Sequence, residues 1–237
     1  LNRPKGTKRN SAPIQEVMML AIREKSVERR GDDSGYYGRL YEAKRGVVEN
    51  NLSGPDISDS EVPVELKSKK PGSKSKMTLF SREPTYDTHS EIRKSKQFLD
   101  KYKNESGKLN TTIKFGSPNN RGFFLDVSDD QRFLFLCNSF ESLPLARWNL
   151  DDVCQKAGEK LVNMDVADFI DEDTYTETKY RGFEVDAFRA LLLSASVVVD
   201  VRMRDSELSG KKAKNRGTAF RIQPNQLGML YKNTENE

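Results

Sequence analysis

The chain has 237 residues, enough for one large domain or for two lobes that share a sheet. Hydrophobic residues make up 35% of it, below the roughly 45–50% that is usual, and charged residues make up 32%, so we expect a core beneath a heavily charged surface. The net charge of +4 does not by itself indicate a nucleic-acid partner, and the longest apolar stretch, residues 190–199, is too short to span a membrane.

Hydrophobic periodicity predicts a mixed α/β fold with a sheet at its centre. In the first half of the chain we expect helices at 13–26 and 36–46, strands at 62–69 and 76–81, a helix that includes Ile92 and Tyr102, and a hairpin of 108–116 with 121–127 around the sequence SPNN. In the second half we expect strands at 132–137, 160–170, 174–185, 196–204 and 218–222, and helices at 149–158 (opened by Trp148), 186–195 and 224–232.

Cysteine and histidine are too sparse to support several kinds of site. Cys137 and Cys154 are the only cysteines, which favours a reducing cytoplasm over a disulfide scaffold. His89 is the only histidine, so neither a Ser-His-Asp triad nor a zinc site of histidines and cysteines is indicated. We expect His89 to be an exposed residue that opens a helix. Any catalysis must therefore depend on carboxylates and lysines.

The distribution of charge is more informative than its sum. Residues 66–82 contain six cations and no acid, residues 208–234 again contain six cations and no acid, and the first ten residues add four more cations. The acids concentrate between Asp151 and Asp186. Such segregation is typical of a basic cleft that binds a polyanion.

Strand 62–69 sets an acid beside a lysine. Glu65 and Lys67 stand two residues apart and therefore project from the same face of the strand, while Leu66 faces the core. Asp56, in the preceding turn, can bring a second carboxylate close to the first. Carboxylate oxygens suit Mg²⁺, and a lysine can orient or deprotonate a metal-bound water and offset charge on a phosphate. The pattern predicts a metal-dependent phosphodiesterase site.

The triplet Glu-x-Lys is weak evidence alone, because the chain contains three copies of it. Glu42 and Lys44 lie in a predicted helix, where residues two apart do not share a face. The copy at 177–179 lies in the acidic region. Only the copy at 65–67 combines a buried strand, an upstream Pro-Asp and a basic surround.

Several ordered blocks add to this pattern. They read DDSGYYGRLYEAKRGVVENN, PD, VELKSK, KMTLFSREP, LNTTIKFGSPNNRG and VDVRM…SGKKAKNRGTAFRI. Together they resemble the MvaI/BcnI family of restriction endonucleases, which is related to the mismatch-repair nicking enzyme MutH. The resemblance implies a PD-(D/E)xK restriction-endonuclease-like fold, with a central mixed sheet flanked by helices and two lobes around a DNA cleft. It also implies Mg²⁺-dependent cleavage of double-stranded DNA, with Mn²⁺ as a possible substitute.

The resemblance assigns catalytic roles to Asp56, Glu65 and Lys67, and to Glu42 in the helix that follows Gly35 and Gly38. The metal ligands it implies are Asp56, Glu65, Glu42 and the backbone carbonyl of Leu66. The sequence departs from the family at residue 81 and in the C-terminal basic loop, where relatives carry histidines. The cleavage chemistry therefore transfers better than the target sequence, for which a CC…GG site is the expectation.

We expect residues 1–140 to form a catalytic lobe and residues 141–237 a DNA-recognition lobe. Basic and amide side chains on the predicted DNA face are Lys69, Lys70, Lys114, Asn119, Asn120, Arg202, Arg204, Lys211, Lys212, Lys214, Asn215, Arg216 and Arg221. In the loop 209–217 we expect Arg216 and Asn215 to read bases and Lys211 and Lys212 to contact phosphates.

Four functions remain open from the sequence. They are a type II restriction endonuclease, a MutH-like nicking enzyme of DNA repair, a catalytically silent DNA-binding protein, and an α/β protein with basic surface loops. The first predicts double-stranded DNA as partner, no membrane, a monomer or transient dimer, a cognate DNA methyltransferase in the same system, and a location in the cytoplasm of a prokaryotic cell.

Overall fold

The computed structural model describes residues 27, 35–47, 54–58, 62–89, 91–205 and 214–236, without the side chains of 214–217. The chain divides into two compact units. Unit 1 comprises residues 1–73, 164–179 and 235–237, and unit 2 comprises residues 74–163 and 180–234. Each unit is thus built from separate stretches of sequence, and the boundary expected after residue 140 falls inside unit 2. The helix expected at 13–26 lies outside the described residues.

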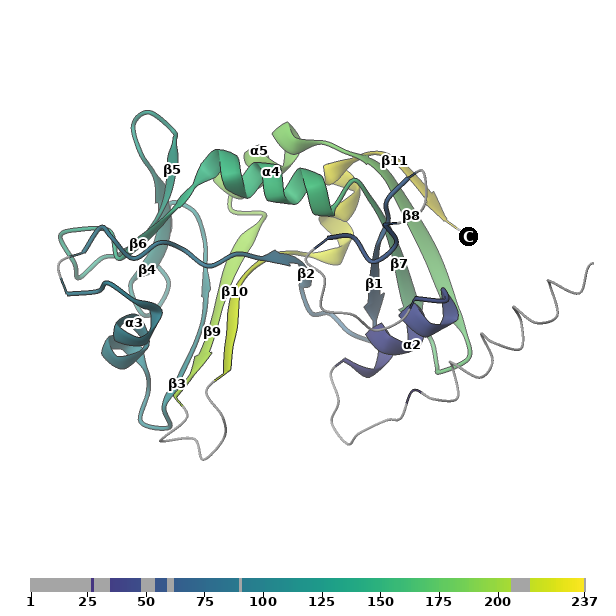
Figure 1. The fold of residues 1–237 in the computed structure, drawn as a ribbon, viewed down its shortest axis with the longest axis horizontal. Helices are drawn as coiled ribbons and strands as arrows, with labels where there is room; N and C mark the ends of the chain where they lie inside the picture. Colours follow the sequence, from purple (N-terminus) through teal and green to yellow (C-terminus); the bar gives the residue numbers. More distant parts are fainter. Residues whose placement is uncertain are drawn as a thin grey trace, which may run out of the picture. The chain divides into compact units, whose positions relative to one another are not determined.

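Helices and strands are mixed, as the sequence predicts (Figure 1). The helices are α2 (Tyr36–Lys44), α3 (Ser95–Tyr102), α4 (Leu150–Lys160), α5 (Val185–Leu193) and the 3₁₀ helix η1 (Pro224–Leu230). The strands are β1 (Glu65–Lys69), β2 (Met77–Ser81), β3 (Lys108–Ile113), β4 (Phe123–Val127), β5 (Phe133–Asn138), β6 (Ala146–Asn149), β7 (Asn163–Phe169), β8 (Tyr175–Phe183), β9 (Val198–Arg204), β10 (Lys214–Ile222) and β11 (Tyr231–Asn236). Instead of one central sheet, the described strands form a first sheet in the order β1-β7-β8-β11, a second in the order β2-β10-β9-β3 and a third in the order β4-β5-β6.

In unit 1, helix α2 packs on one face of the parallel pair β1–β7. Leu66 is the register partner of Asp165, so both side chains lie on the same face of the sheet. On that face Leu66, Ala167 and Phe169 pack against buried α2 side chains, among them Tyr41. The helix ends at Lys44, and Gly46, the predicted stop signal, follows the cap residue. Its φ of 74° is readily adopted only without a Cβ, and its N–H donates to the Ala43 carbonyl at 3.0 Å.

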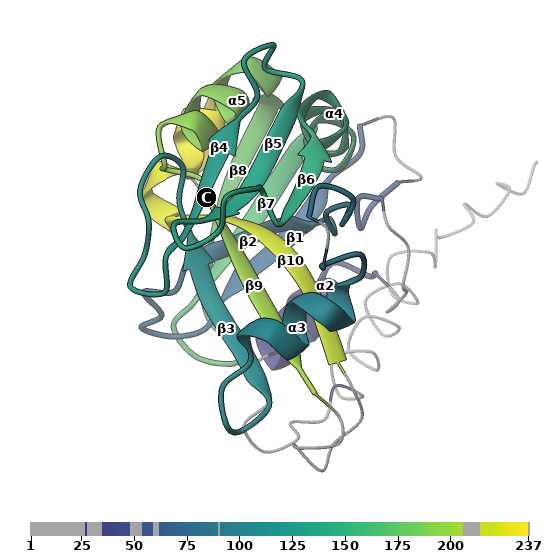
Figure 2. The ribbon, with the colours of Figure 1, turned by 90° about the vertical axis from the view of Figure 1, so that its left-hand side faces the viewer.

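In unit 2, the second sheet separates an apolar face from a polar one. Figure 2 shows β3, β9 and β10 side by side, and their register is antiparallel throughout. Residues alternating along these strands, such as Leu109, Val201 and Phe220, are buried, and the Phe220 ring stacks on Phe80 with 4.9 Å between centroids. Most residues between them, among them Asn110, Asp200 and Arg202, are polar, so this sheet has one face available for polar chemistry.

The hairpin predicted around SPNN does not form. Strand β3 pairs with β9 and strand β4 pairs with β5, so the two strands belong to different sheets. Only isolated bridges, Lys114 with Ser117 and Phe115 with Leu125, connect the segment locally. Strand β3 buries its apolar side beside β9, which is distant in sequence, while β4 pairs with the next strand, β5. This pairing overrides the local turn signal.

Other elements differ from expectation at their ends. Trp148 lies in β6 instead of opening a helix, and Asn149 caps α4 by accepting the Asp152 N–H at 3.0 Å. The last predicted helix is the 3₁₀ helix η1, followed by the unpredicted strand β11. Strand β10 begins at Lys214, four residues earlier than predicted.

The prediction for His89 is wrong, because the side chain is buried and lies before α3. Its Nδ1 accepts the Glu91 N–H at 3.1 Å, and its Nε2 lies 3.3 Å from Glu141 Oε2. These contacts give His89 a structural role. Across the residues that the structure describes, no helix is long and apolar enough to cross a membrane.

Candidate active site

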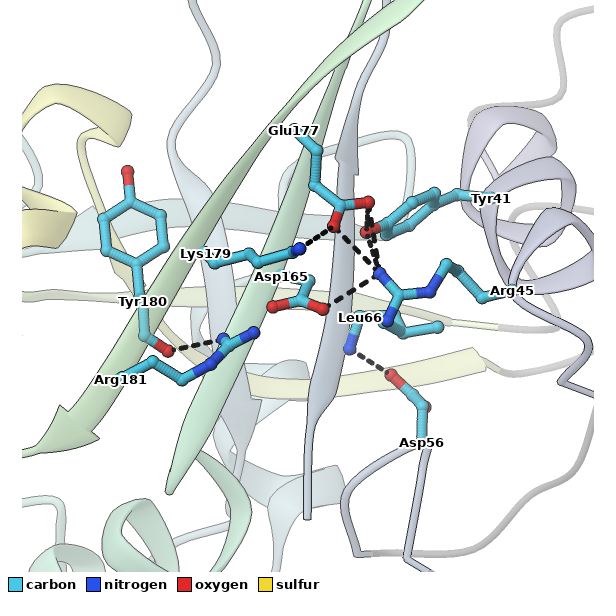
Figure 3. Close-up of polar contacts among 9 residues, drawn as sticks. All are labelled: Tyr41, Arg45, Asp56, Leu66, Asp165, Glu177, Lys179, Tyr180 and Arg181. Atoms are coloured by element: carbon cyan, nitrogen blue, oxygen red, sulfur yellow. Dashed lines mark hydrogen bonds and ion pairs between the residues drawn. The ribbon is translucent and has the colours of Figure 1, made fainter. Parts of the chain in front are cut away.

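Backbone hydrogen bonds hold the turn before β1 beside the start of that strand. Ile57 and Val64 exchange two backbone hydrogen bonds of 3.0 Å each, which makes them a hydrogen-bonded antiparallel pair. This pairing sets Asp56 beside the strand, where its Oδ2 accepts the Leu66 N–H at 2.8 Å (Figure 3). The acid ten residues upstream is therefore held against the middle of the Glu-x-Lys triplet.

The backbone of Leu66 faces the same edge as Asp56. The N–H and the C=O of one strand residue point to the same side, and the N–H of Leu66 points to Asp56. Strand β1 ends the order of the first sheet, so this edge is the one away from β7. The Leu66 carbonyl and the Asp56 carboxylate thus bring two kinds of hard oxygen to one strand edge.

Glu65 and Lys67 project from the face opposite to α2, since they alternate with Leu66. Lys67 Nζ contacts Glu65 Oε1, and Glu65 is only 1% exposed. Their register partners on that face are Met164 and Val166, which surround the pair with apolar groups. A carboxylate in such surroundings needs charge compensation, and Lys67 supplies it.

The same face continues with a second ion pair one step along β1. Lys69 contacts Asp168, its register partner on β7. Lys70, at the end of the strand, is exposed. Three lysines therefore follow the Glu65 carboxylate within five residues, and they make this end of β1 cationic.

Glu42 lies half-buried on α2, the helix that covers the Leu66 face. In the described ranges, no three side chains of histidine, cysteine, aspartate or glutamate are grouped as a metal site. The structure thus brings Asp56, Glu65 and Lys67 together around Leu66 without adding Glu42 to a cluster of three acids. Two carboxylates and a carbonyl are a donor set that Mg²⁺ accepts when water and phosphate complete it.

The polar face of the second sheet centres on Asp200. This buried carboxylate accepts a hydrogen bond from Thr112 Oγ1 at 2.6 Å and contacts Arg202 at 2.9 Å and Arg221 at 2.5 Å. Burial alone raises the pKa of Asp200, but Thr112, Arg221 and Arg202 together outweigh burial and lower it, so the group is a stable anion.

The two arginines on Asp200 differ in exposure. Arg221 is mostly buried and also donates to the Lys76 carbonyl, so it belongs to the framework and is poorly placed to read bases. Arg202 is 49% exposed and keeps one guanidinium nitrogen on Asp200. Exposed Lys108 and Asn110 on β3 are the register partners of Arg204 and Arg202 and share their face. Sequence reasoning missed these β3 residues, although the alternation of Lys108, Asn110 and Thr112 with apolar neighbours was the available signal.

Two residues in the SPNN segment have different surroundings. Asn119 donates to Thr111 Oγ1 at 2.8 Å and to the Thr112 carbonyl at 2.9 Å, and its Oδ1 accepts the N–H groups of Arg121 and Phe123. This side chain is fully used in holding the loop. By contrast, Asn120 and Lys114 are exposed.

The C-terminal basic loop is described only in part. Lys211 and Lys212 lie outside the described residues. Lys214, Asn215 and Arg216 begin β10, and their side chains are outside the description. Their expected contacts with DNA therefore stay predictions.

Comparison with known proteins identifies a family and a fold. The model of the MvaI/BcnI restriction endonuclease family matches residues 16–231. A solved complex of restriction endonuclease MvaI with its cognate DNA substrate is similar with a TM-score of 0.69 and 19% identity, over 97% of this chain and 99% of that one. Restriction endonuclease MvaI in the absence of DNA is similar with a TM-score of 0.50 and 18% identity, over 98% and 99%. No curated protein matches the sequence. At this identity the likeness shows the fold, and it confirms the predicted restriction-endonuclease fold.

Asn119→Ala should lower the free energy of unfolding by about 1–3 kcal/mol, because the hydroxyl, carbonyl and two backbone N–H groups that bond to this side chain would lose their partner. The neighbouring substitution Asn120→Ala should stay within about 0.5 kcal/mol, because that side chain is exposed. Urea denaturation of both variants measures the difference, and equal midpoints would contradict the structural role of Asn119.

Proposed function

Since the chain belongs to the MvaI/BcnI restriction endonuclease family, we propose that it is a type II restriction endonuclease that hydrolyses double-stranded DNA at a short specific sequence with Mg²⁺. The observation that carries this proposal is the cluster on β1, where Asp56 is bonded to the Leu66 N–H and Lys67 contacts Glu65. The CC…GG-type target is the expectation that comes with the family resemblance.

The donor chemistry of the cluster fits a hard divalent cation. We propose Asp56, Glu65 and the Leu66 carbonyl as ligands, and Glu42 as a further acid on α2. When bound, Mg²⁺ polarises the phosphorus–oxygen bond and lowers the pKa of its water, and Mn²⁺ can replace it. The carboxylates hold and orient the cation, and the apolar partners of Glu65 on β7 limit competing water on that face.

Lys67 supplies the positive charge of the site. Its ammonium lies on the Glu65 carboxylate, so it is anchored where a phosphate would arrive. From there it orients or deprotonates the attacking water and offsets the negative charge that develops on the phosphate. Lys69 and Lys70, further along the strand, attract the neighbouring backbone phosphates.

Recognition requires a second surface, and the polar face of the second sheet supplies donors for it. Arg202 is exposed and oriented by Asp200, and an arginine fixed in this way can donate to two acceptors of guanine. Lys108, the register partner of Arg204 on β3, lies on the same face as Arg202, and its ammonium suits a phosphate. The loop 209–217, with Arg216, is the other proposed source of base contacts.

Incubation of the protein with unmethylated phage DNA, with and without Mg²⁺, tests the proposal. Discrete fragments support a restriction enzyme, nicks alone indicate a MutH-like enzyme, and retarded but intact DNA indicates a silent DNA-binding protein. A cleaving enzyme requires protection of the host's own sites, so a cognate DNA methyltransferase is the proposed partner. We also propose that the enzyme acts as a monomer or transient dimer.

Glu65→Ala and Lys67→Ala should each reduce the single-turnover cleavage rate by roughly 10²-fold or more, because each removes a group that acts at the scissile phosphate. DNA affinity, measured by gel retardation, should remain, since it depends on many separate cations. The exposed Lys96 on α3 provides the control, and Lys96→Ala should cleave normally. Retention of more than about a tenth of the rate by either active-site variant would contradict the assigned roles.

Cleavage should require Mg²⁺ or Mn²⁺ and should stop in excess chelator. Ca²⁺ should support DNA binding without turnover, because its looser coordination positions the attacking water poorly. A titration of each ion against cleavage and gel retardation measures both effects. Full activity in chelator would refute a metal-dependent mechanism.

Arg202→Ala should weaken binding to the cleaved sequence by about 1–3 kcal/mol and binding to random DNA very little, because it removes a base contact. Lys108→Ala, on the same face, should weaken both alike and make the slope of log K against log salt shallower by about one. If Arg202→Ala weakens both DNAs equally, base reading lies elsewhere and Arg216 becomes the next candidate.

A further inference from the structure

A buried ion cluster joins three elements of unit 1. We call it the latch, and it consists of Tyr41 on α2, Arg45 at the C-terminal cap of that helix, Asp165 on β7 and Glu177 on β8 (Figure 3). Arg45 Nη1 lies 2.9 Å from Asp165 Oδ2 and 3.0 Å and 3.1 Å from the two Glu177 oxygens. The Tyr41 hydroxyl donates to Glu177 Oε2 at 2.7 Å. One guanidinium thus connects a helix to two strands.

Burying the charged groups of the latch costs free energy, and the ion pairs and hydrogen bonds among its members compensate for that cost. The side chains of Arg45, Asp165 and Glu177 are 28%, 1% and 12% exposed. Burial disfavours the charged form of Arg45, but the Glu177 and Asp165 carboxylates oppose that effect, and the pKa of Arg45 is raised. Burial and the hydrogen bond to Glu177 raise the pKa of Tyr41, so the phenol keeps its proton and stays a donor. Loss of one member leaves buried charge without compensation.

The latch resembles the active site in composition but not in use. Asp165, Glu177 and Lys179 repeat the residue types of Asp56, Glu65 and Lys67, and Lys179 Nζ lies 3.8 Å from Glu177 Oε1. Here, however, the Arg45 guanidinium lies between the two carboxylates, where a metal ion would have to bind. The latch is therefore filled by a cation that the protein itself provides.

The latch lies directly behind the proposed metal site. Asp165 is the register partner of Leu66, whose backbone meets Asp56, and the side chain of Leu66 packs in the same core as Tyr41. Tyr41 and Arg45 also flank Glu42 on α2. A shift of the helix would therefore move Glu42 and loosen the packing behind Leu66 together.

We propose that Arg45 is a positioning residue, which through the latch holds α2 and the Leu66 segment of β1 in the arrangement that binds the catalytic metal ion. This inference rests on the proposed function, because it assumes that Asp56, Glu65 and Glu42 serve a metal. Arg45 itself has no contact with substrate in this role, and acts through the helix and strand that it connects.

The test compares Arg45→Met with a matched control, Arg147→Met. Arg147 is an arginine of similar exposure in unit 2 that makes a two-point ion pair with Asp87. Isothermal titration of the folded proteins with Mn²⁺ should show roughly 10- to 100-fold weaker binding for Arg45→Met and no change for Arg147→Met. The single-turnover rate should fall with metal affinity, while the KM for DNA stays constant. Arg45→Lys should restore only part of both, because the shorter lysine side chain does not place its ammonium where Arg45 Nη1 lies between the two carboxylates.

If Arg45→Met does not fold, Tyr41→Phe replaces it, since it removes one hydrogen bond and keeps the ring in the core; a smaller loss of Mn²⁺ affinity supports the proposal. Wild-type Mn²⁺ affinity in a folded Arg45→Met protein, or in Tyr41→Phe when that variant replaces it, overturns the inference while leaving the proposed function intact. An equal loss in Arg147→Met overturns it as well. If the unaltered protein binds no Mn²⁺ and cleaves no DNA, the proposed function fails, and the positioning role fails with it.

Discussion

The alternation of side chains along β1 is the constraint on which the candidate active site depends. Leu66 points into the core beneath α2, and this direction sends Glu65 and Lys67 to the opposite face. The same alternation turns the backbone of Leu66 to the edge of β1 that faces away from β7, where Asp56 accepts its N–H. One apolar residue therefore fixes where two charges, one carbonyl and one distant carboxylate come together, and a one-residue change of register would separate them all.

Each unit contains a buried aspartate that is paired with an arginine. In unit 1 Asp165 meets Arg45, and in unit 2 Asp200 meets Arg221. In each case the arginine also reaches a further acceptor, the Glu177 carboxylate or the Lys76 carbonyl. The arginines that hold the framework are consequently different residues from those that remain exposed, of which Arg202 is the example.

The sequence predicted features that depend on neighbouring residues. The stop of α2 just before Gly46 and the alternation at Glu65 and Lys67 need only a few positions of context, and both are confirmed by the fold. The family resemblance, which rests on ordered blocks, predicted the fold class that the comparisons show. The position of Asp56 in the turn before the strand indicated that it could approach Glu65, and the structure places it on the N–H of the next residue, Leu66.

Features that depend on distant pairing were not predictable in this way. The hairpin around SPNN was wrong because β3 finds β9, which lies far along the chain. The internal role of Arg221 followed from Asp200 and a carbonyl on another strand, neither of which leaves a mark on its own neighbours in sequence. The same holds for Arg45, whose partners on β7 and β8 are more than a hundred residues away in sequence.

The interleaved construction of unit 1 has a consequence for how the enzyme matures. Strand β1 pairs with β7 across 99 residues, as between Lys69 and Asp168. On a ribosome, therefore, the strand that bears Glu65 and Lys67 cannot pair with β7 until most of the chain has been made. Residues 74–163, the first stretch of unit 2, are made before β7. Closing so long a loop is also slow compared with local pairing. A nascent chain thus exposes the lysines of β1 well before the strand pairing that holds the proposed catalytic groups can form.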